Sequence, residues 1–278
     1  MAQPCRGETH LLNVNSNKMK KLLLLPVLFI SFFFTGCFET TQELTIKTDG
    51  SGEISSNIDM SNAISMMAQM GMSEKEKLIY DTTVAFTSIL DSVEGLTVDD
   101  KKALEKGLIM VNINTDESKL FITTKIPFRD VEDMLKLKSV LEKWSKAGGM
   151  SKVASKAFGE TPGMDELGMD QKSGNSDPFS SLAENYFDVE YKKGKIKRSL
   201  IKDKYAKVHE DEALSKMKEM GEMGMPVKSN FVINLPVPAK NVSGKNVKLS
   251  DDKKKVTIEN TLDELYDDPS KYEFTIEY

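Results

Sequence analysis

The chain has 278 residues, with 38 basic and 43 acidic side chains, a net charge of −5, and 39% hydrophobic residues. This composition permits a sizeable core, and its acidic balance excludes a general nucleic-acid-binding protein. Loss of the residues before Cys37 would remove four basic and one acidic side chain, and would lower the charge to −8.

Residues 18–36 have the features of an export signal. Lys18, Lys20 and Lys21 precede an apolar run from Leu22 to Gly36, which ends in small residues. This layout is typical of a secretory signal peptide. As a helix the run would span roughly 22 Å, less than the about 30 Å of a bilayer core, so we do not expect a transmembrane helix.

The signal has the usual layout if translation starts at Met19. We therefore predict a non-native prefix at 1–18, a signal peptide at 19–36 and a mature domain at 37–278. Cys37 is the only cysteine of that mature chain, so no intramolecular disulfide can form.

Phe34-Thr35-Gly36-Cys37 resembles the bacterial lipobox, in which the cysteine carries palmitate-type acyl chains and becomes the N-terminus. The alternative is that Cys37 is an ordinary small residue near a cleavage site and carries no lipid. Two or more acyl chains anchor a protein stably. We expect a lipoprotein of the bacterial cell envelope, on the periplasmic or surface side of a membrane.

The first half of the mature chain alternates hairpins and helices. We predict a hairpin at 43–60, turning at Asp49-Gly50-Ser51-Gly52. A helix follows from Ser61, and a second runs from Ser73 to Val93, with apolar residues at helical spacing. A short helix at 99–106, a hairpin at 109–128 and a helix at 130–146 complete this half.

The second half opens with a Gly/Ser-rich segment near 147–181, which we predict to be a mobile insert. A hairpin at 186–201 and a helix at 203–223 follow, and then strands at 230–237, 246–250, 255–262 and 271–278. This order predicts an α+β fold, with antiparallel sheets built from hairpins and helices packed on one face.

Catalytic motifs are missing from the sequence. His209 is the one histidine after Cys37, and no G-x-S-x-G, H-E-x-x-H or phosphate-binding glycine loop occurs. Acidic pairs such as Asp263 with Glu264 match no EF-hand spacing and are typical of hydrated loops. We therefore predict a non-enzymatic protein without a cofactor or metal.

Methionine is unusually frequent, with sixteen in the chain. Three interpretations compete: adaptable core filling, an apolar groove for a lipid or a partner, and a thioether site for Cu(I). The candidate groove consists of Met67, Met70, Met72, Met217, Met220 and Met223.

The hairpin at 186–201 is basic. Its lysines either form an ordinary solvated surface or contact anionic headgroups, each basic residue contributing about 1 kcal/mol near such a surface. The candidate contact residues are Lys193, Lys195, Lys197 and Arg198.

Cys37, the hairpin with its Asp-Gly-Ser-Gly turn, and the late strands near 232–236 and 246–258 resemble the LppM-type lipoprotein domain of bacterial envelopes. The resemblance implies a membrane-displayed α+β domain that interacts with lipid or a host surface. We predict a non-enzymatic envelope lipoprotein that binds a lipid, another apolar ligand or a protein partner. The alternatives are an assembly lipoprotein without a small ligand and a Met-rich Cu(I)-binding protein.

Overall fold

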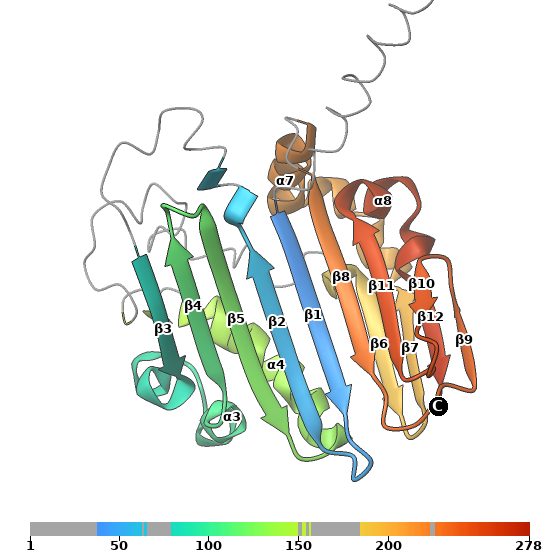
Figure 1. The fold of residues 1–278 in the computed structure, drawn as a ribbon, viewed down its shortest axis with the longest axis horizontal. Helices are drawn as coiled ribbons and strands as arrows, with labels where there is room; N and C mark the ends of the chain where they lie inside the picture. The colour runs from blue at the N-terminus through green and yellow to red at the C-terminus, as the bar shows by residue number, and fades with distance from the viewer. Residues whose placement is uncertain are drawn as a thin grey trace, which may run out of the picture. The chain divides into compact units, whose positions relative to one another are not determined.

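An eight-stranded sheet dominates the computed structural model, which describes residues 38–62, 64–65, 79–149, 152–153, 156, 184–222 and 226–278. These residues belong to one unit, Gly36–Tyr278. The predicted prefix, the signal peptide and Cys37 lie outside the described residues. The strand order is β10-β11-β8-β1-β2-β5-β4-β3 (Figure 1). The bounds are β1 Phe38–Ile46, β2 Gly52–Asp59, β3 Ile79–Ala85, β4 Leu108–Asn114, β5 Lys119–Phe128, β8 Val227–Asn234, β10 Val247–Leu249 and β11 Lys255–Thr261.

All neighbouring strands of this large sheet are antiparallel except β1 and β8, which are parallel. A second, antiparallel sheet has the order β6-β7-β12-β9, with bounds Phe187–Lys192, Lys195–Leu200, Phe274–Glu277 and Asn241–Gly244. Figure 1 shows it behind the β8 and β11 part of the large sheet. Phe231 of β8 and Phe274 of β12 lie 5.8 Å apart between the centres of their rings.

The helices lie behind the large sheet or near the ends of its strands (Figure 1). α4 packs Met134, Leu137, Val140 and Trp144 into the core, and Trp144 meets the ring of Phe86 at 5.3 Å. The α-helices are α3 Val98–Leu104, α4 Val131–Lys146, α6 Lys202–Tyr205, α7 Glu212–Glu222 and α8 Leu262–Asp267. The 3-10 helices are η1 Phe86–Ser88, η2 Leu90–Ser92, η4 Glu184–Tyr186, η5 Val208–Glu210 and η6 Pro269–Tyr272.

The strands of the large sheet alternate between a core face and a polar face. In β1, Leu44 and Ile46 are buried, whereas the intervening positions such as Glu43 and Thr45 are only half-buried. We call the polar side the open face, because the described helix α4 covers the other side. This arrangement confirms the predicted α+β class, with antiparallel pairing predominant.

The strand register defines two ends of the large sheet. At the proximal end, Phe38 of β1 pairs with Val227 of β8, and Glu39 pairs with Asp59 of β2. At the distal end, Ile46 pairs with Gly52. β1 therefore extends about 26 Å between the two ends, at about 3.3 Å per residue.

Several predicted elements differ from the observed ones. The predicted helix from Ser73 to Val93 is wrong where the structure describes it, because β3 and two 3-10 helices occupy 79–92. The predicted helix at 203–223 is divided into α6, η5 and α7. Val153, within the predicted mobile insert, is buried in the core, and residues 157–183 lie outside the described residues. The hairpins at 43–60, 109–128 and 186–201 are confirmed.

Candidate functional site

The junction between Cys37 and the fold is the first candidate site. β1 begins at Phe38, directly after Cys37, and the side chain of Phe38 is only 7% exposed. Its strand lies between β2 and β8 in the interior of the large sheet. The predicted hairpin at 43–60 would leave five residues between Cys37 and its first strand, but β1 already begins at Phe38. An anchor at Cys37 would therefore be joined directly to a central strand.

The basic hairpin carries less free positive charge than its sequence implies. Lys193 is exposed at the turn, but Lys195 forms an ion pair with Glu277 of β12 at 3.0 Å. Lys197 of β7 lies opposite Glu190 of β6, and both side chains lie on the exposed, outer side of the small sheet. The ion pair of Glu190 with Lys192 and the charges of Lys197 and Lys195 lower the pKa of Glu190. Neighbouring strands thus supply acidic partners for these lysines.

Arg198 lies on the inner side of the same hairpin. It is 7% exposed, and its guanidinium carbon is 4.7 Å from the ring centre of Phe187 and 5.7 Å from that of Tyr272. Phe187 and Tyr272 stack on each other at 5.5 Å. The cation is held against aromatic faces in the core, so Arg198 does not lie at the surface where we expected a headgroup contact.

The turn of the basic hairpin lies at the distal end. The Tyr278 N–H donates to Gly194 O, and the Lys240 N–H donates to Glu277 O. The Ala239 N–H donates to Lys253 O, just before β11 begins. A tether that enters at the proximal end would leave this turn about 26 Å away along the strands. The geometry does not support headgroup contact through Lys193, Lys195 and Lys197 in the same membrane.

The methionine groove falls mostly outside the part of the chain that can be described. Met67, Met70, Met72 and Met223 are not among the described residues, and neither is the side chain of Met220. Met217 on α7 is half-buried and packs against the core. Its contacts agree with core filling, while the proposed groove and Cu(I) site remain predictions.

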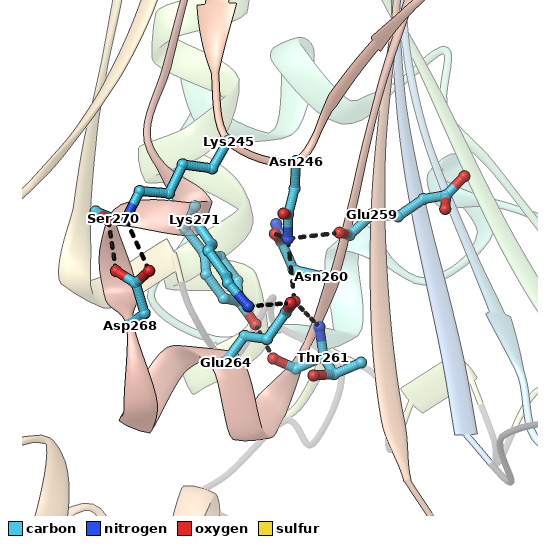
Figure 2. Close-up of polar contacts among 10 residues, drawn as sticks. Lys245, Asn246, Glu259, Asn260, Thr261, Glu264, Asp268, Ser270 and Lys271 are labelled. Carbon is cyan, nitrogen blue, oxygen red and sulfur yellow. Dashed lines mark hydrogen bonds and ion pairs between the residues drawn. The ribbon is translucent and has the colours of Figure 1, made fainter.

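A polar network joins the end of β11 to α8 and η6 (Figure 2). Oε2 of Glu264 accepts hydrogen bonds from the Thr261 N–H at 3.0 Å and from Asn246 Nδ2 at 3.1 Å. Oε1 of the same carboxylate accepts from Lys271 Nζ at 2.8 Å. Asn246 Nδ2 also donates to Asn260 Oδ1 at 2.9 Å. This network was not predicted from the sequence, although Thr261-x-x-Glu264 is a capping-box pattern.

The network holds Glu264 as a carboxylate. Burial alone would raise its pKa, but hydrogen bonds from Lys271, the Thr261 N–H and Asn246 outweigh burial and lower it. A second pair, Lys245 Nζ with Asp268 Oδ2 at 2.8 Å, lies beside it (Figure 2). A carboxylate whose pKa is lowered, and which already accepts three hydrogen bonds, is unsuited to general acid–base chemistry near neutral pH. The network therefore fixes β10 and β11 to α8 and η6.

Metal-binding and membrane-spanning features are missing from the described residues. Among them, no group of three or more His, Cys, Asp or Glu side chains is placed to hold a metal ion. His209 is exposed and lies beside Tyr266, with 5.3 Å between the ring centres and an angle of 35° between the ring planes. Within the same part of the chain, no helix combines the length and apolar character that crossing a bilayer requires.

No protein-family model, curated protein or solved structure matches this chain.

Proposed function

We propose that this protein is a non-enzymatic envelope lipoprotein, tethered through acyl chains on Cys37, that presents its domain to a protein partner. The observation that carries the proposal is the start of β1 at Phe38, beside the predicted anchor. A buried strand residue next to the lipid would fix the domain to the membrane without a flexible linker. Such a short connection suits display of a surface at a defined height.

A protein partner is better supported than an apolar ligand. Large side chains such as Phe86, Ile233 and Leu265 are fully buried and pack into a continuous core. Exposed apolar side chains include Leu108 at the start of β4 and Val237 in the loop after β8, both toward the distal end. Apolar side chains at the surface are available to contact another protein.

Native mass spectrometry after mild detergent extraction tests the proposal. We expect the mass of the domain with acyl chains on Cys37, together with a second protein that co-purifies with it. The matched control is Cys37→Ser, which should lack the acyl mass and no longer be found in the membrane fraction. A bound lipid without a protein would instead favour the ligand groove, and an unmodified Cys37 in wild-type protein would contradict the tether.

A further inference from the structure

We propose that the proximal end of the domain is a membrane-docking surface, on which the domain stands with the strands of the large sheet along the bilayer normal. The inference rests on acylation of Cys37 in the proposed function, and it adds the orientation of the domain and the surface that meets lipid.

The tether between the proposed anchor and the fold is short. Cys37 is the covalent neighbour of Phe38, and one extended residue adds only about 3.5 Å. Phe38 is buried and pairs with Val227, while Glu39 pairs with Asp59. Two neighbouring strands thus hold the residues that follow the anchor. The proximal end must therefore stay close to the headgroups.

The turn between β4 and β5 lies beyond the start of β1. Asp59 pairs with both Glu39 of β1 and Phe121 of β5, so these three lie in one row across the sheet. The turn from β4 to β5, residues 115–118, continues past this row. In an upright domain, this turn would reach the level of the headgroups.

Other surface elements gather at the same end. Ile79 begins β3 opposite Asn114, the last residue of β4, and its side chain is 63% exposed. α7 and α8 also lie at this end (Figure 1). α8 directly follows Thr261, which pairs with Lys228 of β8. The proximal end therefore extends across the width of the large sheet.

The charge of this end selects the type of lipid. Asp116 and Glu117 in the turn are exposed, with Glu117 in an ion pair with Lys119, and Asp263 and Asp267 on α8 are exposed as well. Anionic headgroups would repel these carboxylates. Zwitterionic headgroups carry no net charge and therefore repel these carboxylates less, while Ile79 adds a small apolar contact. The surface therefore fits a zwitterionic leaflet.

A side-on orientation is less favourable. If the open face lay on the bilayer, Glu39, Glu43, Glu53 and Asp59 of the two central strands would all face lipid. Desolvating four carboxylates without basic partners from the lipid is costly. The upright orientation brings only the row of Glu39 and Asp59 near the headgroups and leaves Glu43 and Glu53 in water.

Depth-dependent fluorescence quenching tests the orientation. The mature chain has no cysteine besides Cys37, so a single introduced cysteine gives one labelling site. We would label Glu117→Cys in the proximal turn, Lys138→Cys on α4, Thr257→Cys on the open face and Asp251→Cys in the turn before β11. Each lipidated variant is reconstituted in phosphatidylcholine vesicles that contain headgroup spin-labelled lipid.

The upright orientation predicts a large loss of fluorescence at position 117, weaker losses at 138 and 257, and none at 251. A larger loss at 138 or 257 than at 117, or equal losses at all four sites, would overturn it. Added phosphatidylglycerol should reduce the loss at 117, and an increase would overturn the assignment to zwitterionic lipid. The acyl mass of each sample is measured first, so that missing acylation contradicts the proposed function rather than the orientation.

Discussion

Arg198 is a charged side chain inside an aromatic environment. Its guanidinium lies over the rings of Phe187 and Tyr272, and within 6.0 Å of the ring centre of Phe231. A buried cation is tolerated because aromatic faces attract it and its stem packs as an apolar chain. Arg198 thereby connects the small sheet to β8 of the large sheet.

We predict that Arg198→Ala lowers the free energy of unfolding by about 3 kcal/mol, because it removes buried packing together with the cation. The matched control is Lys197→Ala, the exposed neighbour, which should cost less than about 0.5 kcal/mol. Urea unfolding of both variants measures the difference. Equal decreases in the unfolding free energy of the two variants would show that Arg198 contributes no more to stability than a surface residue.

Glu264 gives the stability a specific dependence on pH. Its pKa is lowered from the ordinary value of 4.5, so the folded state binds its proton less readily than the unfolded state. The carboxylate therefore stabilises the fold above about pH 5, and this stabilisation is lost as pH falls through the lowered pKa. We expect Glu264→Gln to cost about 1–2 kcal/mol at pH 7, and progressively less below pH 4.5.

Urea unfolding at several pH values follows this effect, with Asp263→Asn as the matched control in the same helical turn. Asp263 is exposed, so its replacement should change the unfolding free energy by less than about 0.5 kcal/mol. If the unfolding free energies of wild type and Glu264→Gln differed by the same amount from pH 7 to pH 3, the Glu264 carboxylate would not be the source of this pH dependence.

Among the secondary-structure elements, the β1–β2 hairpin depends on two glycines with different roles. Gly50 has a φ of +86°, with open space around the position of a Cβ, so only its backbone conformation favours glycine. At Gly52 a Cβ would overlap the carbonyl oxygen of Thr45 and the ring of Phe128. Gly52 therefore permits close contact between two strands and the core.

We predict that Gly52→Ala lowers the free energy of unfolding by about 3 kcal/mol, because backbone and core must both shift. Gly50→Ala should cost about 1 kcal/mol, the strain of a left-handed conformation for a residue with a side chain. Thermal unfolding monitored by circular dichroism compares the two. A smaller cost at position 52 than at position 50 would contradict the observed packing.

Elements specified by local sequence could be predicted, and those specified by distant partners could not. The three hairpins combine alternating apolar residues with strong turn residues, as in Asp49-Gly50-Ser51-Gly52. β3 was expected to be helical because Ile79, Phe86 and Leu90 fall at helical spacing. Pairing with β4 determines its structure instead, since its core-facing positions include only one strongly apolar residue, Val84.

The candidate sites were likewise predictable only where local sequence specifies them, and not where distant residues do. The clustering of basic residues near Arg198 predicted a surface, but strand alternation places Ile196 and Arg198 inside and Lys197 outside. The parallel pairing of β1 with β8 joins residues almost two hundred positions apart, which no local pattern reports. The Glu264 network likewise depends on Asn246 and Lys271, brought together only by the fold.

For the molecule as a whole, the parallel pairing of β1 and β8 has a direct consequence for the proposed tether. It places the strand that follows Cys37 between the β2 to β5 part and the β8 to β11 part of the large sheet. Force or orientation imposed at the anchor would be transmitted to both parts. A strand at the sheet edge would transmit them to one neighbour only.

The mass of the N-terminal peptide of the protein isolated from cells tests the tether most directly. We predict a peptide that begins at Cys37 and carries the added mass of a diacylglyceryl group, with or without a third acyl chain. A peptide that begins upstream of Cys37, or one that begins at Cys37 without added hydrocarbon, would contradict the anchored domain described above.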